Sequence, residues 1–135
     1  MINYLAVLAS AIVSIILGAF WYSPSVFGKI WMKLSQTSEK KVAGVRKRRV
    51  FGLYFTNFIA SLVLSFVLAF LIQQLGITDL ISGAGLGILV WFGFILTTHL
   101  GTFLWEDKPL SLYILNMAYQ FIYLVLAGII IVALQ

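Results

Sequence analysis

Four long stretches without a charged residue constrain this chain more than any other feature. No Asp, Glu, Lys or Arg occurs before Lys29, between Arg49 and Asp79, between Asp79 and Glu106, or after Lys108. Each stretch exceeds the roughly 20 residues that a helix needs to cross a hydrocarbon core of about 30 Å. Because 62% of the 135 residues are hydrophobic, a soluble domain of this length has too little interior to hide them. The sequence therefore predicts a multispan helical membrane protein.

We expect an all-α membrane protein, a four-helix transmembrane bundle that forms a single domain over residues 1–135. The expected spans cover about 2–22, 50–73, 80–105 and 110–134. The first span could also be a signal peptide. However, no basic residue precedes it, its apolar part is too long, and its basic residues follow it. We therefore interpret it as a retained helix.

The positive charges predict the orientation. Eight of the nine Lys and Arg residues lie between Lys29 and Arg49, and the ninth is Lys108. All nine thus fall on one face of a four-span topology, which the positive-inside rule places in the cytoplasm, with both termini outside. A basic collar before the second span is expected to meet anionic lipid headgroups rather than nucleic acid. The collar consists of Arg46, Lys47, Arg48 and Arg49.

The stretch FWYSPSVFGKIWMKLS, residues 20–35, follows the first span. Its aromatic pair is typical of a membrane interface, and Ser-Pro is a good helix start. Apolar and lysine-bearing faces then alternate with helical spacing, which predicts a short amphipathic interfacial helix over about 24–35. An anchoring elbow and a gate or lipid-contact element both fit this pattern. The residues assigned to this feature are Trp21, Tyr22, Pro24, Phe27, Lys29 and Trp31.

This turn also carries a resemblance to a known family. NYLAVLASAIVSIILGAFWYSPSVFGKIWMKL, followed later by WFGF and FLWEDKPLSLYILNMAYQFIYLVLAG, resembles a widespread prokaryotic family of small four-span membrane proteins of unknown function. Trp-Tyr-Ser-Pro followed by Phe-Gly-Lys and Trp is the most specific part. The resemblance covers nearly the whole chain and implies four helices in a prokaryotic envelope membrane. It implies no catalytic residues.

Several polar side chains lie inside the expected spans. In hydrocarbon each of them needs a partner. A rise of 1.5 Å per residue places four of the five in one layer, roughly 10–13 Å inside the cytoplasmic face. This layer is either interhelical hydrogen bonding or a hydrated pocket in which His99 is a proton-sensitive centre. The predicted layer consists of Ser14, Asn57, His99, Asn116 and Gln120.

Small residues recur in the third span. Gly93, Thr97 and Gly101 are spaced by four, on the side away from His99, and Gly83 and Gly87 repeat this spacing nearer the outside. Small residues allow two membrane helices to approach closely. We expect the first three to form a helix-packing seam, against a helix of this chain or of a second copy.

The sequence carries no recognisable catalytic or cofactor motif. There is no Cys, and therefore no disulfide or thiolate metal site, and Glu106 and Asp107 lack a His or Cys partner outside the membrane. We expect no enzyme, no metal and no cofactor. Two functions remain open: a small carrier or channel-like unit, working as an oligomer such as a homodimer, or an accessory subunit that docks another membrane protein through the glycine seam.

Overall fold

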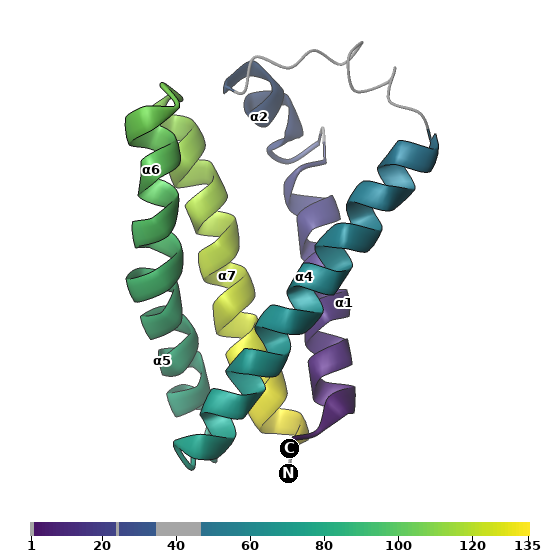
Figure 1. Cartoon of the computed structure of the whole chain (residues 1–135), viewed down its shortest axis with the longest axis vertical. Helices are drawn as coiled ribbons and strands as arrows, with labels where there is room; N and C mark the ends of the chain where they lie inside the picture. Colours follow the sequence, from purple (N-terminus) through teal and green to yellow (C-terminus); the bar gives the residue numbers. More distant parts are fainter. Residues whose placement is uncertain (1, 24, 35–46) are drawn as a thin grey trace.

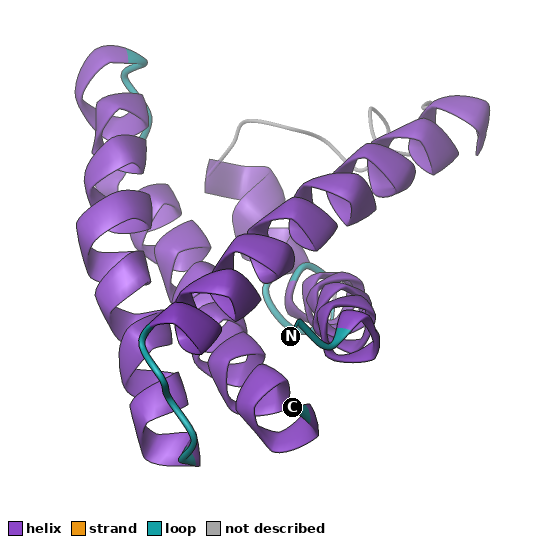
Figure 2. Cartoon of the chain, turned by 60° about the horizontal axis from the view of Figure 1, so that its bottom comes forward, coloured by secondary structure: helices purple, strands orange, loops and turns teal. Residues whose placement is uncertain are grey.

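The computed structural model describes residues 2–23, 25–34 and 47–135, apart from the side chains of 47–50 and 102. The described part is helical and contains no strand. Its elements are α1 (Tyr4–Trp21), α2 (Gly28–Leu34), α4 (Lys47–Gln74), α5 (Leu80–Val90), the π-helix η1 (Trp91–Leu96), α6 (Thr97–Trp105) and α7 (Leu110–Leu134). Figure 2 shows the described helices, with α4 running obliquely across the others.

Four described helical stretches are long and apolar enough to cross a membrane. They are Tyr4–Trp21, Phe51–Gln74, Leu80–Trp105 and Leu110–Leu134. The third comprises α5, η1 and α6, which follow one another without a break. The predicted fold class is therefore confirmed, and a short helix, α2, follows the first of the four.

Local capping sets several of the helix ends. The Asn3 side chain accepts a hydrogen bond from the Leu5 amide at the start of α1, and Asp79 accepts one from the Ser82 amide at the start of α5. After α4, Gly76 has a φ of 67° and Ile77 donates back to the Ile72 carbonyl. Such a left-handed glycine is a common helix stop. The capping residues thus divide the long apolar stretches into separate helices.

The core is centred on α7, which packs against both α5 and α1. An apolar cluster joins these helices to the second half of α4. Its fully buried members, at 0–1% exposure, are Ala6, Leu68, Ile72, Leu124 and Ala127.

Glycines bring α5 and α7 into backbone contact. A Cβ added at Gly87 would lie 2.2 Å from the Leu124 carbonyl oxygen, and one at Gly128 would lie 2.1 Å from that of Gly83. Real Cβ atoms do not approach so closely, so each of these positions requires glycine. The expected close contact at Gly83 and Gly87 is confirmed, and the helix that meets them is α7. Gly128 was not singled out from the sequence.

The helices converge at one end of the molecule and diverge at the other. Both termini and residues 75–79 lie at the converging end, called the termini end below (Figure 1). The opposite end carries α2, the first turn of α4 and residues 106–109, and is called the basic end (Figure 1). In α4 the buried residues are Ser61, Ser65, Leu68, Ala69 and Ile72, and none of residues 51–60 is buried. The first half of α4 thus leans away from the bundle.

Candidate functional site: polar side chains of the basic end

Hydroxyl groups join α1, α4 and α7 at mid-height. The Ser14 hydroxyl lies 2.8 Å from that of Ser61, and the Tyr119 hydroxyl donates to the Ser14 carbonyl at 2.9 Å. One turn nearer the termini end, Ser65 donates to the Ser10 hydroxyl at 3.0 Å, and its hydroxyl lies 2.9 Å from that of Tyr123. We call these six residues the hydroxyl ladder. Because all six are buried and hydrogen-bonded, the ladder is a packing feature.

The face of α4 that forms the core becomes polar beyond this ladder. Asn57 lies one turn before Ser61, and Tyr54 lies seven residues before it, so both share the face that Ser61 and Ser65 present to the bundle. Both are exposed, because α4 has already diverged from its neighbours there. No hydrogen bond joins the Asn57 side chain to another described residue.

The same change occurs on α6 and α7. His99 follows Ile95 by four residues, and Ile95 packs against the core, whereas His99 is exposed. Gln120 precedes the fully buried Ala127 by seven residues and is only half-buried. Three helices therefore turn from apolar to polar on their inward faces, at the end where they separate.

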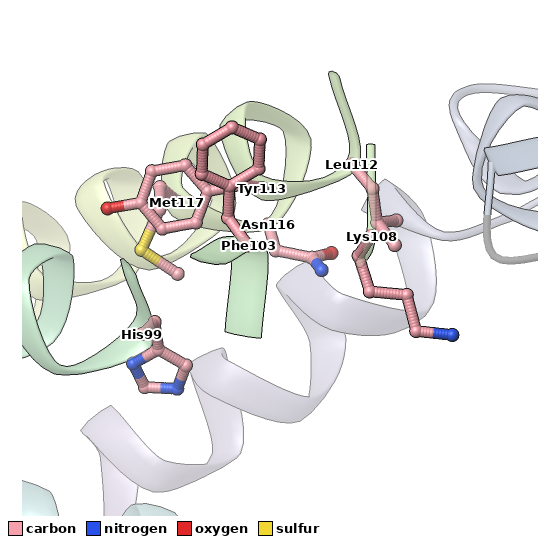
Figure 3. Close-up of a pocket in the computed structure, with 7 residues that line it drawn as sticks. All are labelled: His99, Phe103, Lys108, Leu112, Tyr113, Asn116 and Met117. Carbon is pink, nitrogen blue, oxygen red and sulfur yellow. The ribbon is translucent and has the colours of Figure 1, made fainter. Parts of the chain in front are cut away.

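His99 and Asn116 line one small pocket between α6 and α7, shown in Figure 3. The cavity volume is about 50 Å³. This is enough for a few water molecules but far below the 300 Å³ or more that is typical of sites for drug-sized ligands. The other lining residues are Phe103, Lys108, Leu112, Tyr113 and Met117.

Hydrogen bonds fix the orientation of two pocket groups. His99 Nδ1 lies 3.0 Å from the Ile95 carbonyl, which can only accept, so Nδ1 carries the proton and Nε2 is left without a partner among the described residues. The Tyr22 hydroxyl donates to Asn116 Oδ1 at 2.7 Å. This bond leaves the Asn116 amide NH₂ as a donor.

The π-helix lies directly before these pocket residues. Four consecutive carbonyls, those of Gly93 to Leu96, accept side-chain hydrogen bonds. The donors are Thr97, Thr98, His99 and Tyr113. Trp91 Nε1 also donates to the Met117 carbonyl at 2.9 Å, which ties η1 to α7. Side-chain donors thus support a helical segment whose own hydrogen-bond pattern is widened, a feature often found near functional sites.

Residues 21–23 and 25–31 form a compact elbow after α1. The Gly28 amide donates to the Ser23 carbonyl at 2.8 Å, and a Cβ at Gly28 would lie 2.4 Å from the Tyr22 carbonyl oxygen. The Trp21 and Phe27 rings are 4.5 Å apart, and the Tyr22 and Trp31 rings meet edge to face at 6.1 Å. The motif therefore folds the chain back on itself through a glycine contact and two aromatic pairs.

This elbow differs from the predicted interfacial helix in two respects. The helix begins at Gly28 rather than near residue 24, because the Ser23 hydroxyl donates to the Phe20 carbonyl and does not cap α2. Phe27 and Trp31, which belong to the apolar face of the predicted helix, are half-buried and pack on rings of the chain itself. Lys29 is exposed, as an interfacial lysine should be. Pro24 lies outside the described residues.

The structure brings only part of the predicted polar layer together. His99 and Asn116 share the pocket, whereas Ser14 belongs to the hydroxyl ladder and Asn57 and Gln120 line neither. A single layer closed by all five residues is not present in the described chain. It separates because the first half of α4, which carries Asn57, leans away from α6 and α7 (Figure 1).

The predicted glycine seam makes no contact with another helix of the described chain. A Cβ at Gly93 would meet nothing within 4 Å, and one at Gly101 would meet only Trp105 of its own helix. Thr97 is exposed. Of the basic collar, Arg46 lies outside the described residues, and Lys47, Arg48 and Arg49 form the first turn of α4.

Sequence reasoning missed Tyr119 and the pairing of the hydroxyls. On each expected span, some polar residues share one helical face, but a sequence does not show which of these faces meet. The residues concerned are Ser10, Ser61, Ser65 and Tyr123. The signal that was present for Tyr119 is its spacing of four from Tyr123.

These features define the class of protein: a helical integral membrane protein whose helices pack closely through glycines at an apolar end and separate at a polar end. The family model for proteins of unknown function DUF1761 matches residues 5–132, and the chain belongs to that family. The predicted resemblance is thereby confirmed. No curated protein and no solved structure matched the chain.

Proposed function

We propose that this protein is a non-enzymatic carrier or channel-like unit of a prokaryotic cytoplasmic membrane and that it works as an oligomer. The observation that carries the proposal is the change from apolar to polar on the inward faces of α4, α6 and α7 where they diverge. Moving an unpaired amide or imidazole from water into hydrocarbon costs on the order of several kcal/mol of free energy. Water between the helices avoids this cost, which favours a hydrated space lined by Asn57, His99 and Asn116.

An oligomer follows from the small dimensions of one chain. The pocket of about 50 Å³ is too small to pass a solute other than water or a small ion. The exposed inner face of α4 offers Asn57 no partner among the described residues. A second copy facing this side would enclose the polar groups between two chains, and the closed pathway would then contain side chains from both.

Both termini are proposed to face outward, with the basic end in the cytoplasm. The termini and residues 75–79 lie together at one end, and α2, the first turn of α4 and residues 106–109 lie at the other (Figure 1), so every Lys and Arg with a described backbone is at one end. Because the chain has no native cysteine, single cysteines at Asp79 and Lys41 can be probed in intact cells with an impermeant thiol reagent. Labelling at position 79 alone is expected, and labelling at position 41 alone would reverse the orientation.

The function itself is tested in vesicles. Purified protein reconstituted into liposomes should increase the permeability to at least one class of small solute or ion, measured by stopped-flow swelling and by a trapped pH-sensitive dye. His99→Gln keeps hydrogen-bonding capacity but cannot be protonated, so it should remove pH dependence of the flux while the fold is retained. Permeability equal to that of protein-free vesicles for every solute and ion tested would reject the proposal.

One observation favours a second function, that of an accessory subunit. The face of Gly93, Thr97 and Gly101 is open in the described chain, and small residues at this spacing suit close docking of another helix. Purification in mild detergent separates the two functions. A defined homodimer supports the carrier, whereas a different membrane protein that co-purifies in fixed ratio and is lost on Gly93→Leu supports the accessory role.

A further inference from the structure

We propose that the pocket between α6 and α7 binds a small oxyanion of the phosphate type, either free phosphate or the phosphate of a lipid headgroup. This inference rests on the proposed function, because it names the class of ligand that the polar basic end would admit. It is carried by the donors in the pocket, by the charge of its lining and by its size.

The first support is the set of donors. The Tyr22 hydroxyl donates to the carbonyl oxygen of Asn116, which leaves the NH₂ of this amide free to donate to a ligand. Lys108 contributes its side chain to the lining, and an ammonium is a strong donor to phosphate oxygens. Figure 3 shows the Lys108 ammonium turned away from His99, at the end of a flexible side chain whose rotamers exchange within nanoseconds.

The second support is the sign of the local charge. Lys108 is the one charged residue among those lining the pocket, and the nearby Glu106 and Asp107 are exposed and do not line it. The amides of Leu112 and Tyr113 at the amino end of α7 already donate to the Pro109 carbonyl, so the positive charge at the pocket comes from Lys108. An anion is thus favoured over a cation.

The third support is size. A water-sized group needs roughly 10–15 Å³ of such volume, so a cavity of about 50 Å³ holds about four of them. A space of this size admits a group as small as phosphate. His99 Nε2, which is left without a partner, provides a further contact: it accepts from a protonated phosphate oxygen, or it donates when the imidazole is itself protonated.

The test uses His99 as the reporter, because it is the only histidine of the chain. Full-length protein labelled with ¹⁵N-histidine in a phosphate-free detergent is titrated with inorganic phosphate at constant pH and ionic strength. A saturable shift of the His99 ring signals is expected. Absence of a saturable shift, both with phosphate and with short-chain phosphatidylglycerol, would overturn the proposal.

Three variants test the assignment of the donors. Lys108→Gln should weaken binding about tenfold, the equivalent of one charge-assisted hydrogen bond. Asn116→Asp can still accept from Tyr22 but replaces the NH₂ by a second carboxylate oxygen, so it should abolish binding by repulsion. Lys29→Gln removes an exposed lysine from the same end and is the matched control. Equal weakening by Lys29→Gln and Lys108→Gln would contradict the site even if Asn116→Asp failed to fold.

The two sources of phosphate give different results. If free phosphate is the ligand, inorganic phosphate shifts the His99 signals in the phosphate-free detergent and short-chain phosphatidylglycerol does not. If a headgroup is the ligand, phosphatidylglycerol produces the shift in the same detergent, and inorganic phosphate neither produces nor displaces it. Anion binding without vesicle permeability would reject the proposed function alone, whereas permeability without anion binding would reject this inference alone.

Discussion

The same apolar helices pack closely at the termini end and separate at the basic end. At the termini end, Gly83, Gly87 and Gly128 let two helix backbones touch, and apolar side chains fill the remaining space. At the basic end the corresponding inward positions hold Asn57 and His99, and the helices separate. The comparison teaches that in a chain this apolar, hydrophobicity does not decide where helices pack. Small residues and satisfied hydroxyls decide it.

The largest expected effect comes from filling the glycine contact. In Gly87→Ala the new Cβ would lie 2.2 Å from the Leu124 carbonyl oxygen, so α5 and α7 must move apart. We expect a loss of unfolding free energy of about 3 kcal/mol or more, at or above the usual cost of overpacking. Thermal or denaturant unfolding in detergent measures it.

Gly85→Ala is the matched control, two residues away on the same helix. Nothing lies within 4 Å of its added Cβ, and alanine is the better helix former. Its stability should equal or slightly exceed that of the wild type. Similar losses in both variants would mean that α5 is sensitive to any side chain and that the backbone contact is not the cause.

An intermediate effect is expected in the hydroxyl ladder. Ser65→Ala removes two hydrogen bonds, to Ser10 and Tyr123, and should cost about 1 kcal/mol, since such bonds average about 0.6 kcal/mol each in membranes. Asn57→Ala, eight residues earlier on the same face, should leave the unfolding free energy unchanged. A double-mutant cycle of Ser65→Ala with Tyr123→Phe should give a coupling energy different from zero. If Asn57→Ala were the more destabilising change, the contrast between the ends would be wrong.

The smallest effect concerns the loop before α5. The hydrogen bonds from Ser82 hold the pKa of the Asp79 carboxyl below its usual value. The folded state thus favours the ionised form, and this stabilisation is present above the usual pKa and is lost as the pH falls through the lowered one. Asp79→Asn can still cap the helix but does not titrate. Its melting temperature should match the wild type at pH 7 and fall less between pH 5 and pH 3.

Much of the fold could be predicted from the distribution of charge. The charge-free stretches located the four long helices, and the aromatic pair with Ser-Pro located the elbow after α1. Their ends were less predictable, because the Ser23 hydroxyl bonds backward to α1 instead of capping α2. The oblique path of α4 could not be predicted, since it depends on which helices meet.

The site was predicted only in part, for the same physical reason. Spacing on one helix shows which residues share a face, so the polar faces that carry Asn57, His99 and Asn116 could be predicted directly. Spacing does not show which faces of different helices meet. Ser14 proved to pair with Ser61 and Tyr119, and Asn116 with Tyr22, while Lys108 joined the pocket from the loop.

The central claim is that the inner face of α4 passes from a dry, packed half to a hydrated half between Ser61 and Asn57. A series of single cysteines along this face tests it directly, because the chain has no native cysteine. The positions are Tyr54, Asn57, Ser61, Ser65 and Leu68, with Ile59 on the opposite, lipid-directed face as control. The measurement is the rate of reaction with a small water-soluble thiol reagent in liposomes.

The account predicts fast reaction at positions 54 and 57, because a thiol needs water to form the reactive thiolate. It predicts little reaction at 61, 65 and 68, which are buried, or at 59. Reaction at 57 as slow as that at 59 would show that lipid or protein, not water, covers the polar face. Fast reaction continuing through 65 and 68 would show that the termini end is not closed, and either result would contradict the account.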